Sequence, residues 1–343
     1  MKNVLGIDAA KFFGIGLIIL AHVDQIIGIT DRIATDHTAK ILERLFHVMG
    51  YYGVSLFLVA SGFGLALSLL NKQQINWKQW YLKKIGKIYI LFWISYAFFL
   101  GFFFIGHKFW HAIPPTSITF KEFITTLLGI QAYFGYWGGH INAVYWFNTL
   151  IISLYAIFPL LFLFLRKFRW WKILLIFVAS FIISYLVIGQ DWKMFIYFFP
   201  DRIFEFSFGI MAAYFCFHKK ELFSKTLYSI LFFILAVIIF IVYFKILGNF
   251  MTVSLVLLTG PLLFSGFILL LEKISLQSLI AKVLHTGAQY SHALFLFHLP
   301  FFALYATHTL NRWELILVYI FSVLITTYFG QRLANRINFY FFK

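Results

Sequence analysis

The sequence predicts an all-α membrane protein of about ten transmembrane helices. Of its 343 residues, 62% are hydrophobic and 12% are charged, and the mean hydropathy is +0.88. Soluble domains are about 45–50% apolar and about 25% charged, so no water-facing fold could bury this much apolar surface. The apolar runs are continuous and approach the length of about 20 residues that a helix needs to cross a bilayer. The strands of a membrane barrel would instead alternate in polarity.

Ten apolar stretches have the length expected of membrane-spanning helices. We expect these helices over 5–28, 47–70, 85–106, 143–165, 171–189, 200–217, 226–247, 250–271, 289–308 and 313–334. The aromatic, amphipathic stretch 118–137 is expected to be a re-entrant or interfacial segment rather than a full span. No internal repeat, linker or soluble C-terminal part is visible, so we expect a single membrane domain over 1–343.

The distribution of basic residues predicts the orientation of the chain. If the N-terminus is in the cytoplasm, the inside segments carry 18 of the 28 Lys and Arg residues and the outside segments carry 7. Cytoplasmic loops of membrane proteins carry such an excess of basic residues. Both termini are therefore expected in the cytoplasm, in agreement with an even number of spans.

Charge and cysteine content argue against several functions. The net charge of +16 is spread over alternate inter-helix loops rather than gathered on one soluble face, so we expect no nucleic-acid partner. Cys216 is the single cysteine, which excludes an internal disulfide and a cysteine-rich metal site. We expect no metal and no permanently bound cofactor.

The first predicted helix carries ionisable residues at depths where each costs about 2.5–3.5 kcal/mol to insert. Lys11 and His22 are eleven residues apart, which is about 20° past three full turns, so they share one face along a rise of about 16 Å. Asp8 lies one turn before Lys11 and is its expected counter-ion. One interpretation is a functional stripe from the cytoplasmic side toward the outer leaflet. The other is a snorkelling lysine, an ion pair and a buried histidine that fastens helices together.

Further polar residues occur in three other predicted helices. Lys84 and Lys87 are one turn apart at the start of the third helix, where they could bind phosphate groups or simply anchor the positive inner side. His298 falls near the middle of the ninth helix. Arg202 and Glu205, at positions i and i+3 of the sixth helix, suit a structural ion pair.

The outer segment 133–140 combines aromatic residues with glycines. Tyr136 and Trp137, together with Trp110, offer flat faces on which sugars could stack. The alternative is an ordinary aromatic belt at the membrane interface, which needs no ligand.

These motifs, taken in order, resemble acyltransferase family 3, the bacterial ten-helix enzymes that O-acylate sugars and other extracytoplasmic acceptors. Asp8, Lys11 and His22 are similar to the family's first-helix signature. The later blocks are Gly53–Phe63, with Ser55 in place of an aspartate; Lys84 and Lys87, in place of a basic pair that is usually arginine; Trp146, Tyr155 and Pro159, with Ile151 and Ile152 in place of a glutamate pair; Arg202, Glu205, Phe206 and Gly209; and Ser291–His298, with Phe295 in place of a tyrosine.

The resemblance implies a multi-pass enzyme of the bacterial cytoplasmic membrane that moves an acyl group, most simply acetyl, from cytoplasmic acyl-CoA to a hydroxyl of a cell-surface glycan. His22 would be the general base, with a covalent acyl-histidine as the competing route. The implied catalytic residues are Asp8, Lys11, His22 and His298; the donor would bind Lys11, Lys84 and Lys87; the acceptor site would include Tyr136, Trp137, Trp146, Arg202 and Glu205.

Two other functions stay open at this stage. Buried charges also mark the substrate pathways of transporters and flippases, although no pairing of two halves is visible here. A purely structural subunit of a polysaccharide export machine would leave the Lys11–His22 stripe without a purpose.

Overall fold

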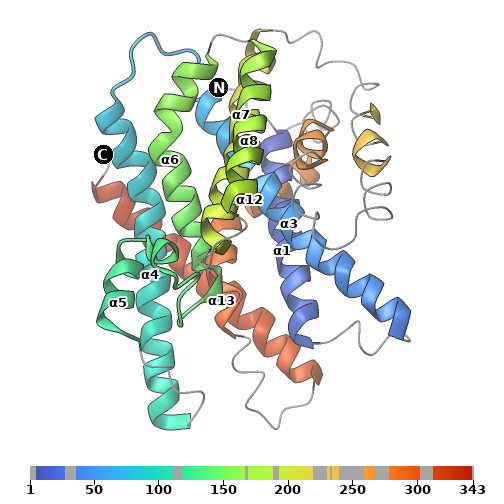
Figure 1. Ribbon diagram of the computed structural model, residues 1–343. Coiled ribbons are helices and arrows are strands. Elements are labelled where there is room, and N and C mark those ends of the chain that lie inside the picture. The colour runs from blue at the N-terminus through green and yellow to red at the C-terminus, as the bar shows by residue number, and fades with distance from the viewer. Residues whose placement is uncertain are drawn as a thin grey trace. The chain divides into compact units, whose positions relative to one another are not determined.

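The computed structural model describes residues 5–27, 36–110, 118–166, 169–187, 193–218, 230–231, 234–238, 259–266, 278–301 and 312–341, and every regular element in these ranges is helical (Figure 1). The long helices are α1 (Leu5–Ile27), α3 (Asp36–Leu67), α4 (Trp77–Trp110), α6 (Trp146–Leu165), α7 (Trp170–Val187), α8 (Lys193–His218), α12 (Leu279–Phe297) and α13 (Arg312–Phe341). The short elements are α5 (Phe120–Leu127) and the 3-10 helices η1 (Gln131–Phe134) and η2 (Ala143–Tyr145). The predicted all-α class is confirmed for the described part of the chain.

Five of the described helical stretches are long and apolar enough to cross a membrane. They are Leu5–His22, Val48–Leu67, Trp77–Ile105, Ala143–Leu165 and Ile316–Phe341. The total of ten spans and the cytoplasmic position of both termini stay predictions. The expected helices 226–247 and 250–271 lie largely outside the described residues.

Several helices begin earlier than hydropathy predicts. α3 starts at Asp36 rather than 47, α4 at Trp77 rather than 85, and α8 at Lys193 rather than 200. Hydropathy locates only the apolar part of a helix. A helix satisfies its own backbone hydrogen bonds, so it can continue through polar residues beyond that part.

Within the described part of the predicted helix 289–308, α12 starts earlier, at Leu279, and ends at Phe297; residues 302–308 lie outside the described residues. Pro300 explains this end, because a proline has no N–H to donate to the carbonyl of Leu296 and its ring crowds that carbonyl. The Leu296 carbonyl instead accepts hydrogen bonds from Asn142 Nδ2, at 2.8 Å, and from Ser95 Oγ, at 3.4 Å. Side chains from other elements thus replace the missing backbone donor.

The segment 118–137 is divided into two short elements, and neither could span a bilayer. Thr119 caps α5 by accepting a hydrogen bond from the Glu122 backbone N–H, and the helix lasts only eight residues. Gly129, with a φ of +66°, turns the chain before η1 begins at Gln131. The prediction that this stretch is not a full span agrees with these lengths, whereas its placement at or within the membrane stays a prediction.

The chain forms two compact units built from alternating segments. Unit 1 comprises Met1–Ile75, Ile157–Gly189 and Tyr197–Ser291, and unit 2 comprises Asn76–Ala156, Gln190–Ile196 and His292–Lys343. The prediction of a single domain stays a prediction, and each unit is described below by itself.

In unit 1, α1 and α3 approach each other closely because glycines face each other at the crossing. A Cβ atom on Gly53 would lie 2.5 Å from the carbonyl oxygen of Gly14 and 2.6 Å from Ile18 Cγ1. A Cβ atom on Gly50 would lie 3.2 Å from the Ala21 side chain. These contacts place one side of α1 directly against α3.

The backbones of α3 and α8 also meet in unit 1. A side chain on Gly62 would overlap the Phe206 carbonyl, and one on Gly209 would overlap the Val59 carbonyl. These glycines are the positions at which two helices can approach to backbone distance, because neither carries a Cβ atom.

We predict that Gly53→Ala destabilises the protein by about 1–3 kcal/mol, because the added methyl group has no space against α1. Gly64→Ala on the same helix is the matched control, since a Cβ atom there would meet nothing within 4 Å. Thermal unfolding in detergent measures both variants. Equal unfolding temperatures for the two variants would contradict the described α1–α3 crossing.

Candidate functional site

The Lys11 and His22 side chains lie on the protected side of α1, as the helical spacing predicts. Both are intermediate in exposure, whereas Phe13 and Leu20 are 44% and 49% exposed. At 100° per residue, the mean direction of Lys11 and His22 is about 180° from that of Phe13 and Leu20. The stripe therefore points away from the exposed edge of α1 and toward the interior of unit 1.

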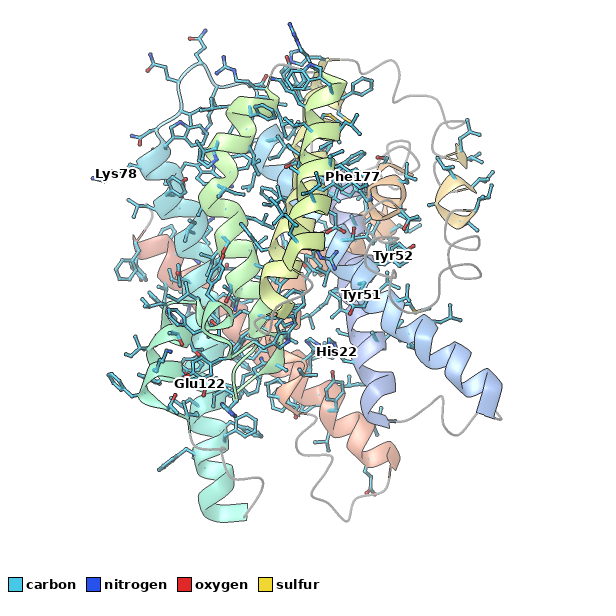
Figure 2. The ribbon with its side chains drawn as sticks, viewed as in Figure 1. His22, Tyr51, Tyr52, Lys78, Glu122 and Phe177 are labelled. Atoms are coloured by element: carbon cyan, nitrogen blue, oxygen red, sulfur yellow. The ribbon has the colours of Figure 1, made fainter. Side chains whose placement is uncertain are left out.

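His22 is close to the contact between α1 and α3. Its neighbour Ala21 is 3% exposed and faces Gly50 of α3. Figure 2 shows His22 on α1 in the same region as Tyr51 and Tyr52 of α3. The Tyr52 hydroxyl is hydrogen-bonded to the Thr259 hydroxyl at 2.5 Å.

Asp8 has a hydrogen-bond partner that the spacing along α1 did not reveal. His285 of α12 donates a hydrogen bond through Nδ1 to Asp8 Oδ2, at 2.8 Å. The second ring nitrogen, Nε2, accepts a hydrogen bond from the Gln289 side-chain amide, also at 2.8 Å. The Asp8 carboxylate still acts electrostatically on Lys11, so it is shared between an ammonium and an imidazole.

Arg202 and Glu205 form a fully buried ion pair on α8. Arg202 Nη1 donates to both carboxylate oxygens, at 2.9 and 2.8 Å, and both side chains are 0% exposed. The Ser55 hydroxyl of α3 lies close enough to stabilise the Glu205 charge, and Arg202 acts electrostatically on Tyr51. A methyl group on Gly260 would overlap Ser55, so the residue at 260 must be very small.

The burial of Arg202 and Glu205 distinguishes two interpretations of this ion pair, a structural role and a contact with substrate. A substrate could reach it only through a change in packing, because neither side chain has exposed surface. The structure therefore favours a structural ion pair over a substrate contact at Arg202 and Glu205.

In unit 2, Lys84 and Lys87 lie one turn apart on α4. Lys87 is exposed and Lys84 is partly buried, with Ile88 behind them in the core. Two ammonium groups on one helix face can bind a polyanion, and they can equally anchor the helix at an anionic membrane surface.

An aromatic residue of the loop before α6 stacks on the first residue of that helix. The Trp137 and Trp146 rings are nearly parallel, at 21°, with centroids 5.3 Å apart. Trp137 has a φ of +46°, a conformation that costs a non-glycine residue about 1–3 kcal/mol. The Tyr136 hydroxyl lies 3.3 Å from the Thr119 hydroxyl, which joins this loop to the start of α5.

His298 of unit 2 is 0% exposed and its protonation pattern is defined by backbone groups. Nδ1 lies 2.8 Å from the Phe295 carbonyl and 3.2 Å from the Leu294 carbonyl. Because carbonyls only accept, Nδ1 carries the proton and the basic lone pair of the neutral ring is on Nε2.

The predicted site residues therefore belong to two groups. Asp8, Lys11, His22, Arg202 and Glu205 lie in unit 1; Lys84, Lys87, Tyr136, Trp137, Trp146 and His298 lie in unit 2. The polar partners that sequence reasoning missed are His285 and the pair Glu122–His140. The sequence carried a weak signal for the second pair only at His140, which directly follows Gly138 and Gly139.

Comparison with protein families identifies the class. A family model described as an acyltransferase domain matches residues 4–331. Because this match covers essentially the whole chain, the protein belongs to acyltransferase family 3, as the motifs predicted. It is a membrane acyltransferase. No match was found among curated proteins or solved structures.

We predict that Glu205→Leu alone destabilises the protein by about 3–5 kcal/mol, because it leaves the Arg202 guanidinium buried without its carboxylate. The double variant Arg202→Met/Glu205→Leu removes both charges and is expected to recover most of that stability. Thermal unfolding measures both variants. A double variant that folds normally but loses acyl transfer would contradict a purely structural role for the pair.

Proposed function

We propose that this protein is an O-acetyltransferase of the bacterial cytoplasmic membrane, which it crosses several times with both termini inside. It takes acetyl from cytoplasmic acetyl-CoA and transfers it to a hydroxyl group of a cell-surface glycan. The observation that carries this proposal is the position of Lys11 and His22 on the protected side of α1, opposite Phe13 and Leu20. A basic group and an imidazole held along one inward face suit a donor that enters from the cytoplasm.

His22 is the general base in the proposed reaction. Its neutral imidazole takes the proton from the acceptor hydroxyl as the oxygen attacks the thioester carbonyl, and the new C–O bond forms. The C–S bond breaks, and the leaving thiolate recovers the proton from the imidazolium. An unperturbed histidine has a pKa near 6.5, so the neutral form is abundant at pH 7.

The basic residues serve the donor. In this proposal Lys11 binds an anionic group of the donor on the cytoplasmic side of His22; Asp8, which acts electrostatically on Lys11, is hydrogen-bonded to His285. Lys84 and Lys87 bind phosphate oxygens of coenzyme A through charge-assisted hydrogen bonds. His298 stays a candidate catalytic residue, with its ring proton on Nδ1.

The aromatic loop serves the acceptor. Trp137 and Trp146 present stacked indoles, and Tyr136 contributes a hydroxyl beside them. Flat apolar faces of this kind can pack against the C–H face of a sugar, as in other binding sites that combine aromatic rings with a few polar groups.

We predict that His22→Ala reduces acetyl transfer by about 10²–10⁴-fold, the usual contribution of general-base catalysis. Purified protein is incubated with radiolabelled acetyl-CoA and de-acetylated surface polysaccharide, and label in the polysaccharide is counted. His218→Ala, at an exposed position on α8, is the control and is expected to retain activity. Unchanged transfer in a folded His22→Ala variant would refute the assigned base, whereas movement of an unmodified solute into liposomes would favour a transporter.

We predict that Lys84→Gln and Lys87→Gln each raise the KM for acetyl-CoA by about tenfold, because each removes one charge-assisted hydrogen bond of about 1.5 kcal/mol. The increase should shrink at high salt. Lys78→Gln, at an exposed position on the same helix (Figure 2), is the matched control. An equal effect at Lys78 would show only general attraction by positive charge.

A further inference from the structure

A carboxylate–imidazole pair in unit 2 includes none of the residues assigned above. Glu122 of α5 accepts two hydrogen bonds from His140 (Figure 2 labels Glu122). The His140 backbone N–H donates to Oε1 at 2.8 Å, and Nδ1 donates to Oε2 at 2.6 Å. The Glu122 side chain is 2% exposed, whereas that of His140 is 43% exposed. The buried Glu122 carboxylate therefore binds a histidine that lies at the surface.

The buried carboxylate determines the chemistry of the exposed ring. A carboxylate accepts but does not donate, so the neutral imidazole carries its proton on Nδ1. Its Nε2 then presents a lone pair, and among the described residues no group hydrogen-bonds to it. The ring donates one hydrogen bond to Glu122, the His140 backbone donates the other, and the ring offers a single acceptor atom at its exposed edge.

The backbone of the loop turns tightly at two glycines, which places His140 next to Glu122. Gly139 has a φ of +81°, and a Cβ atom there would lie 3.3 Å from Glu122 Oε1. A side chain on Gly138 would overlap the backbone of Ala143. Two successive glycines are thus required for the tight return of the chain.

The same loop carries the Trp137–Trp146 stack. Trp137 precedes His140 by three residues and also adopts a positive φ, so both side chains depend on the same unusual backbone path. An indole and an oriented hydrogen-bond acceptor carried by one loop match the two features of a sugar, its apolar C–H face and the hydroxyl donors at its rim. A purely structural clamp would need the backbone bond to Glu122 but not an exposed ring edge.

We propose that Glu122 and His140 form a hydroxyl-binding subsite for the glycan acceptor. His140 Nε2 accepts a hydrogen bond from a sugar hydroxyl, and Glu122 is the positioning residue that holds the ring in the required tautomer. This inference rests on the proposed function, because the glycan bound here is the one that receives the acetyl group. The subsite gives specificity for the acceptor and takes no part in cleavage of the thioester.

The test separates binding of the acceptor from chemistry on the donor. His140→Ala is expected to raise the KM for de-acetylated surface polysaccharide by about tenfold, the value of one hydrogen bond to an oriented acceptor. It should leave unchanged the KM for acetyl-CoA and the slow hydrolysis of acetyl-CoA without polysaccharide. Lys121→Gln, at the exposed neighbouring position on α5, is the matched control and should change none of these values.

Glu122→Gln tests the positioning role. An amide can donate to Nδ1, which moves the ring proton to Nε2 and replaces the acceptor with a donor. The KM for polysaccharide should rise although His140 is intact and the variant folds, as judged by thermal unfolding. The proposal would be overturned if both variants raised the KM for acetyl-CoA as much as the KM for polysaccharide. It would also be overturned if the KM for polysaccharide did not change.

Equilibrium binding of the same polysaccharide fragments, followed by tryptophan fluorescence, distinguishes failure of the subsite from failure of the proposed function. If the wild-type protein transfers no acetyl group but binds the fragments in a His140-dependent manner, the subsite stands and the transfer reaction is wrong. If it transfers acetyl and His140→Ala binds as tightly as the wild type, the subsite is wrong and the reaction stands.

Discussion

The close contact between α1 and α3 determines which way α1 faces, and the proposed chemistry depends on that rotation. Gly14 and Gly53 allow the two backbones to approach, with Ile18 packed beside them. A helix has one rotational setting for each set of contacts, so this side of α1 cannot turn outward without losing them. Lys11 and His22 are consequently held on the inner side, where an ionisable group can meet other polar groups instead of lipid.

The ionisable side chains inside this protein interact in small clusters whose members come from different helices. Asp8 is shared by Lys11 on its own helix and His285 on another, and Glu205 is stabilised by Arg202 and by Ser55. An isolated charge in a low-dielectric interior is much more costly than a paired one. Such pairing lets a mostly apolar chain retain ionisable residues in its interior.

The described part of unit 2 contains irregular backbone, whose polar groups need hydrogen-bond partners outside a helix. Pro300 ends α12 and leaves the Leu296 carbonyl without its helical donor, and Asn142 and Ser95 supply the replacements. The loop before α6 uses Gly138 and Gly139 to make its return. Polar side chains in this unit therefore serve the backbone as well as any ligand.

The sequence by itself determined the helical class, the membrane environment, the family and the shared face of Lys11 and His22. All of these follow from composition, order along the chain or a period of 3.6 residues, which are local properties. Only the tertiary structure decided that Asp8 bonds to His285, 277 residues away, that Glu122 holds His140, and that α12 ends at Phe297. These features depend on which elements pack together and on which donors replace a missing backbone bond, and no local period encodes either.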